Sequence, residues 1–204
     1  MNDQIAALKD DLAFVRAMAQ DIDKPNSRAG LILISAGTLF GAASLVHWSI
    51  VSQLIKAPMA TVNYVWLAAI VAFWLALYLA LRGPKPSQSR ASKAANMAWS
   101  GVGWALFNLA ICAVAVAWRT HSTDVLLLFP AIVLSLYGAA WSVAAAVSAK
   151  RWMGLTAAAS FALAIGMALV CNQPAAYLLY AVALTLTATV PGLVMLRQAR
   201  AAQA

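Results

Sequence analysis

Six long apolar runs decide what this chain can fold into. They cover about residues 30–52, 62–82, 97–118, 125–148, 153–171 and 175–196. The hydrocarbon core of a bilayer is about 30 Å thick, and an α-helix needs roughly 20 apolar residues to cross it. A membrane β-strand would be about ten residues long with alternating polarity, and these runs do not alternate. The pattern therefore predicts an all-α fold, a polytopic membrane bundle of six transmembrane helices.

The composition excludes an ordinary water-soluble domain. Of the 204 residues, 64% are hydrophobic and 10% are charged, whereas soluble domains are about 45–50% apolar and about 25% charged. The charged residues lie in short clusters between the apolar runs. The chain is thus expected to have the lipid bilayer as its solvent, and the net charge of +8 is not taken to indicate a nucleic-acid partner.

The basic residues alternate between the two sides of the predicted bundle. Lys56 is the only basic residue between spans one and two, and Arg119 is the only one between spans three and four. The link between spans five and six has no charged residue. The other twelve basic residues precede span one or follow an even-numbered span. Short loops rich in Lys and Arg stay in the cytoplasm. This bias predicts a multi-pass protein of a cell (inner) membrane with both termini cytoplasmic.

The runs divide the chain into three parts. Residues 1–28 form a cytoplasmic segment, residues 29–197 form the transmembrane domain, and residues 198–204 form a cytoplasmic tail. Because each pair of spans leaves the cytoplasmic side and returns to it, we expect three helical hairpins over about 30–82, 96–150 and 152–197.

The N-terminal segment is expected to be an amphipathic helix. Its apolar residues recur every three or four positions, which is the spacing of one helix face; they are Ile5, Leu8, Leu12, Val15, Met18 and Ile22. Helices that lie on anionic lipid are usually rich in Lys and Arg, but this segment has four basic and five acidic residues. The face is therefore a candidate for contact with protein, either its own bundle, a second copy or another subunit.

Small residues and one proline mark candidate packing positions inside the spans. Close approach of membrane helices favours small residues, and Gly37 with Gly41 forms such a spacing in span one, as Gly138 with Ser142 does in span four. Pro191 lies within span six and removes the helical bond to the carbonyl of Thr187. Both a structural kink and a substrate site are compatible with a broken helix.

No pattern in the sequence indicates catalysis. The spans have no Asp, Glu, Lys or Arg near their centres, and ionisable groups there would mark ion or proton paths. His47 and His121 are expected on the outer side, and two histidines with few acidic neighbours make a poor metal or haem site. Cys112 and Cys171 lie within apolar runs and fix no disulfide. We expect no enzyme activity, cofactor or metal.

Three functions stay open. The first is a non-enzymatic accessory or scaffold subunit that packs with itself, as a homo-oligomer, or with a larger membrane complex. The second is a small transporter or channel for an uncharged or weakly polar solute, with a polar cavity near Asn108, Thr187 and Pro191. The third is an intramembrane enzyme or cofactor binder around His47 and His121.

Overall fold

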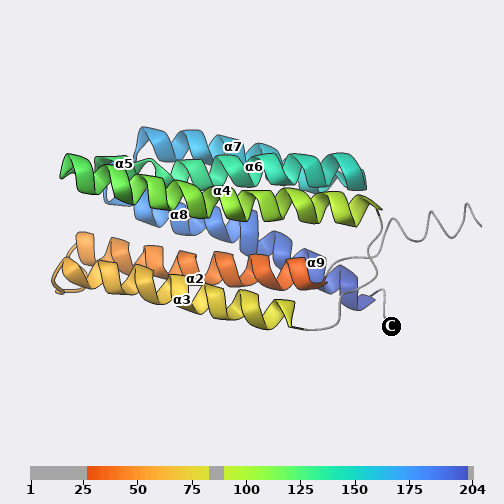
Figure 1. The fold of residues 1–204 in the computed structure, drawn as a ribbon, viewed down its shortest axis with the longest axis horizontal. Helices are drawn as coiled ribbons and strands as arrows, with labels where there is room; N and C mark the ends of the chain where they lie inside the picture. Colours follow the sequence, from red (N-terminus) through yellow and green to blue (C-terminus); the bar gives the residue numbers. More distant parts are fainter. Residues whose placement is uncertain (1–26, 83–89, 202–204) are drawn as a thin grey trace, which may run out of the picture.

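The computed structural model describes residues 27–82 and 90–201 (Figure 1), and these residues form helices joined by short turns. The elements are α2 Ser27–Val51, α3 Ala60–Leu81, α4 Arg90–Thr120, α5 Asp124–Leu127, α6 Phe129–Ser148, α7 Arg151–Leu169, α8 Ala175–Leu184, the π-helical turn η1 Thr185–Thr189, and α9 Val190–Ala201. The predicted N-terminal helix and the tail after Ala201 lie outside the described residues.

Six segments are long and apolar enough to cross a membrane. They are Ser27–Val51, Ala60–Leu81, Lys93–Thr120, Asp124–Ser148, Arg151–Leu169 and Ala175–Ala201. Each coincides with one predicted run to within a few residues. The prediction of an all-α fold with six helices long and apolar enough to span a membrane is confirmed for the described residues.

Span four begins with a break that the sequence explains. α5 ends at Leu127, α6 begins at Phe129, and Pro130 lies in the first turn of α6. Proline has no backbone N–H, so it cannot donate to the carbonyl four residues earlier, and it is tolerated where a helix starts. The first turn of span four is therefore a separate short helix.

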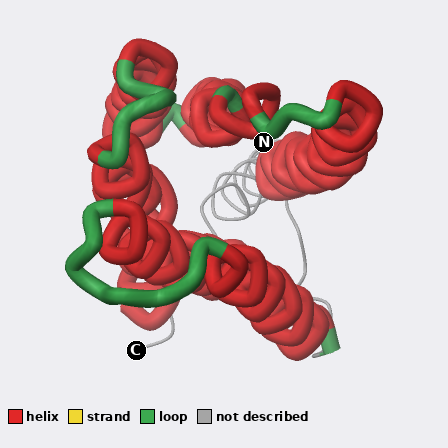
Figure 2. The backbone as a smooth tube through the Cα atoms, turned by 90° about the vertical axis from the view of Figure 1, so that its left-hand side faces the viewer, coloured by secondary structure: helices red, strands yellow, loops and turns green. Residues whose placement is uncertain are grey.

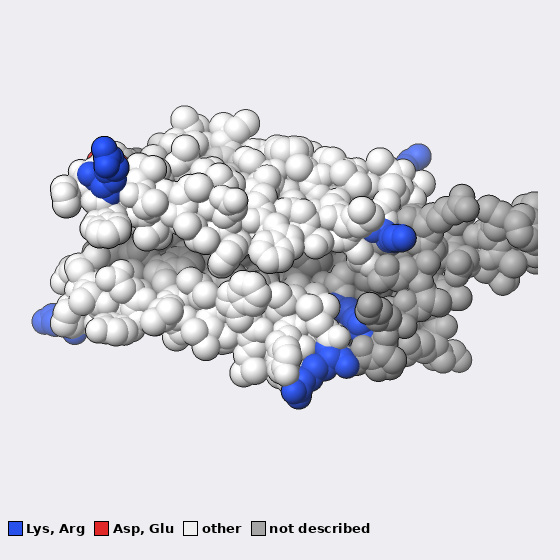
Figure 3. Space-filling model, in the orientation of Figure 1, with Lys and Arg blue, Asp and Glu red and all other residues white. Residues whose placement is uncertain are grey.

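The basic side chains gather toward the two ends of the bundle. Figure 3 shows Lys and Arg near both ends of the long axis and a broad band without them between. This distribution is the one expected of a protein whose middle lies in hydrocarbon, since a charged side chain there is costly.

The helix backbones are arranged as an arc (Figure 2). α3 packs against α2, α2 packs against α8, η1 and α9, and α7 joins this group to α6, which also contacts α4. In the most apolar 18 residues of each span, only 6% are buried in α3 and in α4, against 28% to 44% in the other four. α3 and α4 are thus the two bare ends of the arc, and they meet where Trp74 of α3 packs edge-on against Phe107 of α4, with ring centroids 6.1 Å apart.

The predicted division into three hairpins is not confirmed. α2 packs on α3 and α4 packs on α6, but α7 packs mainly on α6, and span six packs mainly on α2. The principal contacts of the last two spans therefore lie outside the predicted third hairpin.

Candidate functional site

Span six contains a π-helical turn directly before Pro191. The N–H of Val190 donates to the carbonyl of Thr185, five residues earlier, where an α-helix would use four. Pro191 has no N–H and its ring clashes with the carbonyl of residue 187 in a regular helix. The wider turn moves that carbonyl away from the ring, so the irregularity follows from the proline. Single π-helical turns occur often at functional sites.

A tryptophan from another span takes the place of the missing donor. The indole Nε1 of Trp141 in α6 donates to the carbonyl oxygen of Thr187 at 2.9 Å. Both residues are fully buried. An unpaired backbone carbonyl and an unpaired indole would each be costly in hydrocarbon. The bond satisfies both groups and joins α6 to the broken span.

The threonine hydroxyls of this turn bond to their own helix. Thr187 Oγ1 donates to Ala183 O at 2.8 Å, and Thr185 Oγ1 donates to Ala181 O at 2.9 Å. Such back-bonding is common for Ser and Thr in helices. These two hydroxyls therefore serve the local backbone and not an open cavity.

Glycines let α2 approach the broken span closely. A Cβ at Gly37 would overlap Thr189 Oγ1 and lie 2.8 Å from Thr189 N. A Cβ at Gly30 would lie 2.8 Å from Gly192 O, and one at Gly192 would lie 2.7 Å from Gly30 O. Gly37 thus lies where α2 and η1 come closest together.

The remaining predicted packing positions differ in how closely a neighbouring helix approaches them. A Cβ at Gly41 would lie 3.8 Å from Ala181 O, which is ordinary van der Waals distance. Gly138 in α6 faces the ring of Phe161 in α7, and an added Cβ would come within 2.8 Å of it. Ser142 is exposed and donates to Gly138 O in its own helix.

A second cluster lies near the far end of α2. The indole Nε1 of Trp66 in α3 donates to His47 Nδ1 at 3.1 Å, and the His47 ring stacks on Tyr177 of α8 with centroids 3.6 Å apart. One turn earlier, the buried Ser44 donates to Tyr177 O at 2.8 Å. Because Nδ1 accepts, the imidazole is neutral with its proton on Nε2. The cluster ties α2, α3 and α8 together.

The described histidines, cysteines and acids do not assemble into a metal site. His121 is exposed just after α4, whereas His47 is packed between helices. No group of three or more His, Cys, Asp or Glu that could hold a metal occurs in the part of the chain that the structure describes. Cys112 and Cys171 are both free thiols.

Asn108 lies on an exposed face of α4, apart from the buried Thr187. Its Oδ1 accepts a weak bond from the thiol of Cys112 at 3.3 Å, one turn along the same helix. The polar cavity predicted near Asn108, Thr187 and Pro191 is therefore not formed by these side chains alone, because Asn108 and Thr187 face different surroundings.

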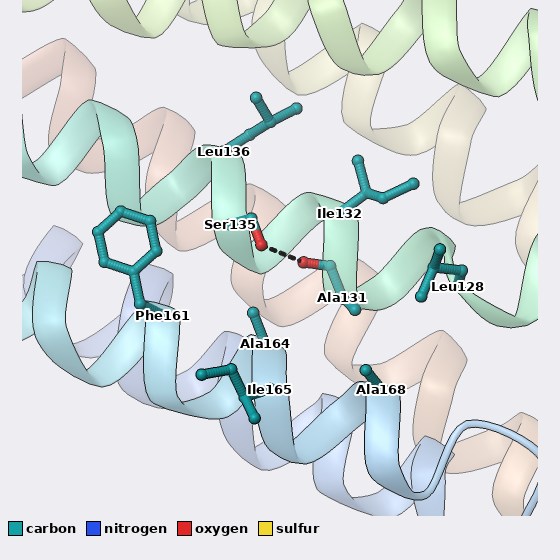
Figure 4. A pocket seen from close by; sticks show the side chains of 9 residues that line it. All are labelled: Leu128, Ala131, Ile132, Ser135, Leu136, Phe161, Ala164, Ile165 and Ala168. Carbon is teal, nitrogen blue, oxygen red and sulfur yellow. Dashed lines mark hydrogen bonds between the residues drawn. The ribbon is translucent and has the colours of Figure 1, made fainter.

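An open groove of about 490 Å³ runs between α6 and α7 (Figure 4). Apolar side chains line it, including Ile132, Leu136 and Phe161, and its one polar side chain is Ser135. The Ser135 hydroxyl donates to Ala131 O at 2.9 Å. The groove thus offers apolar contact and no free polar group that would orient a solute.

Sequence reasoning missed four positions at the two junctions: Gly30, Ser44, Trp66 and Gly192 contact other spans in the structure. One signal was available, because Gly30, Gly37, Gly41 and Ser44 are small residues spaced by seven, four and three. That spacing is typical of a helix seam that faces a neighbour.

Comparison with other proteins adds no relative: no family of known proteins matches the chain, and no curated protein or solved structure does.

Proposed function

We propose that this chain is a non-enzymatic accessory or scaffold subunit of a cell (inner) membrane that acts by packing its helices against a second copy or a partner complex. The observation that carries the proposal is the bareness of α3 and α4, in which only 6% of the most apolar window is buried. Their exposed faces include large aromatic side chains such as Tyr64, Trp74 and Trp104.

Two of these aromatic residues favour a protein partner over lipid alone. Trp74 is 50% exposed and Trp104 is 68% exposed. Both lie inside their spans, where lipid tails offer no acceptor for an indole N–H. A protein surface can supply backbone or side-chain oxygen atoms at that depth.

The charge bias supports the proposed orientation. The structure places the exposed Lys56 between α2 and α3 and the exposed Arg119 at the end of α4, both on the side poor in basic residues. With this side outside the cell, the N-terminal and C-terminal segments are cytoplasmic. In this orientation the apolar face predicted from Ile5 to Ile22 is proposed as a second contact for a cytoplasmic partner.

The transporter alternative receives less support from the described residues. The hydroxyls of Thr185 and Thr187 donate to carbonyls of their own helix, and the groove between α6 and α7 is apolar. Solute sites need polar groups that converge on a ligand.

The test is the mass of the native particle. We expect gentle detergent extraction from the native membrane, followed by native mass spectrometry, to give a particle heavier than one copy of 21.5 kDa. The excess should equal further copies or a stoichiometric partner. A uniform single copy without protein partners contradicts the proposal.

Two matched variants connect the particle to the bare surface. Val71 of α3 is 60% exposed and Leu155 of α7 is 73% exposed. Val71→Trp adds bulk to a bare span and should lower the fraction of the heavier particle, whereas Leu155→Trp should leave it unchanged. Equal effects of the two substitutions would show that α3 is not the contact.

A further inference from the structure

We infer that the partner of α4 is a second copy of this chain, and that the two copies pair α4 with α4 through a seam centred on Asn108. This inference rests on the proposed scaffold function and names the partner of one of its two bare helices. It starts from the unmet hydrogen-bonding capacity of one side chain.

Asn108 lies near the middle of its span. It is fifteen residues from Lys93 and eleven from Arg119, which bound the span, so at 1.5 Å per residue it is about 17–22 Å from either charge. A side-chain amide has two N–H donors and one carbonyl acceptor. Only the Asn108 carbonyl has a partner among the described residues, the thiol of Cys112. Lipid tails cannot accept from the amide N–H groups.

Asn108 lies on the side of α4 opposite its contact with α6. Trp99 of α4 contacts Tyr137 and Trp141 of α6, with ring centroids 5.3 and 5.1 Å apart. At about 100° per residue, Asn108 lies about 180° around the helix from Trp99. Cys112, one turn on, lies on the same side as Asn108. Among residues 27–82 and 90–201, the other helices therefore do not supply the missing acceptor.

A line of small residues that includes Asn108 runs along α4, beside the exposed Trp104 and Ile111. We call them the small-residue face of α4: Ala94, Ala98, Gly101, Ala105, Asn108, Cys112 and Ala115. The spacing alternates between four and three, which is the heptad repeat of a left-handed helix pair. A Cβ at Gly101 would meet nothing within 4 Å. The space in front of Gly101 is therefore open.

A second copy fits this face better than an unrelated helix does. All copies insert with the same orientation, so a two-fold axis along the membrane normal places each α4 residue opposite itself. Asn108 then meets Asn108 at equal depth, and an amide is self-complementary because it both donates and accepts. Polar side chains of this kind hydrogen-bond across membrane helices.

Cys112 provides a native probe of the seam. In membranes that contain the Cys171→Ala protein, Cys112 is the only cysteine, and copper phenanthroline should oxidise it to a disulfide-linked dimer. Cα atoms joined by a disulfide lie about 4.4–6.8 Å apart, so the reaction requires close pairing of the two helices. The expected result is a band of twice the monomer mass that a reducing agent removes.

The matched control moves the thiol to another face of the same helix. Val114 is 61% exposed and lies about 160° around α4 from Cys112. A protein with Cys112→Ala, Cys171→Ala and Val114→Cys should give little dimer. Equal cross-linking of both thiols would overturn the inference, since it would reflect random collision in the bilayer.

Asn108→Leu tests the amide itself. It should lower the Cys112 dimer yield by about threefold, the loss expected for one hydrogen bond between membrane helices, and Asn108→Gln should restore the yield. The thermal unfolding temperature of each monomer shows whether the variant still folds. An Asn108→Leu protein that folds and still dimerises fully contradicts the role of the amide.

The two proposals can fail separately. If Cys112 links to a different protein, or does not link while the purified particle retains a stoichiometric partner, the α4 pair is wrong and the scaffold function stands. If the purified protein is a single copy and Cys112 does not link, both fail.

Discussion

The indole nitrogen of Trp141 and the carbonyl oxygen of Thr187 lie 2.9 Å apart in the buried centre of the bundle. Pro191 frees this carbonyl from its own helix, and Trp141 in α6 is the donor that satisfies it. The indole N–H and the carbonyl would each be costly if unpaired in hydrocarbon, and this hydrogen bond satisfies both of them. It also joins the broken span to α6 at the point of the break.

Trp141→Phe should destabilise the protein by about 1–2 kcal/mol, because it keeps most of the ring but leaves the Thr187 carbonyl buried without a donor. Reversible unfolding in mixed micelles measures this loss. Trp118→Phe is the matched control, since Trp118 is 81% exposed, and its effect should be near zero. Equal losses of unfolding free energy in the two variants would mean that the hydrogen bond from Trp141 to Thr187 does not stabilise the protein.

Pro191→Ala restores a backbone N–H that can donate within the helix. The Thr187 carbonyl then depends less on Trp141, so Trp141→Phe should cost less in the Pro191→Ala background than in the natural one. We expect a difference of about 0.5–1 kcal/mol in a double-mutant cycle of unfolding free energies. If the changes in unfolding free energy of the two single variants add up to that of the double variant, Pro191 and the Trp141 indole do not act on the same carbonyl.

The sequence was sufficient to predict the spans and the position of the break. Span length depends on bilayer thickness and on local composition, so the runs near Ser27–Val51 and Ala175–Ala201 could be read directly. The missing N–H of Pro191 is also a local property. Each of these features depends on residues close together in the chain.

The pairing of the spans could not be predicted in the same way. Gly30 meets Gly192 across more than 150 residues of sequence, and Trp141 meets Thr187 from another span. Lipid-facing and helix-facing surfaces are both apolar, so hydropathy does not distinguish them. For the same reason the bareness of α3 and α4 was not visible in their composition, which resembles that of the buried α2.

Gly37→Ala should weaken the contact between α2 and span six. The new Cβ overlaps Thr189 Oγ1 and lies 2.8 Å from Thr189 N, which is backbone and cannot turn aside. We expect a loss of about 1–3 kcal/mol, the usual cost of overpacking.

Gly103→Ala is the matched control for that substitution. A Cβ at Gly103 meets nothing within 4 Å, and alanine is the better helix former by up to about 1 kcal/mol. The control should therefore be neutral or slightly stabilising in the same unfolding assay. A Gly37→Ala protein as stable as the control would show that α2 and η1 do not approach as closely as the structure has them.

Surface labelling of introduced cysteines tests the proposed orientation. Lys56, between α2 and α3, and Arg151, the first residue of α7, are both exposed and lie at opposite ends of the bundle. In a background with Cys112→Ala and Cys171→Ala, Lys56→Cys should react with a membrane-impermeant maleimide in intact cells or spheroplasts, because its turn is poor in basic residues. Arg151→Cys should react only after the membrane is permeabilised.

The permeabilised sample is the control for accessibility, since both thiols should then label fully. Labelling of Arg151→Cys, but not of Lys56→Cys, in intact cells would reverse the topology and move the N-terminal apolar face to the other side of the membrane, where it could not contact a cytoplasmic partner.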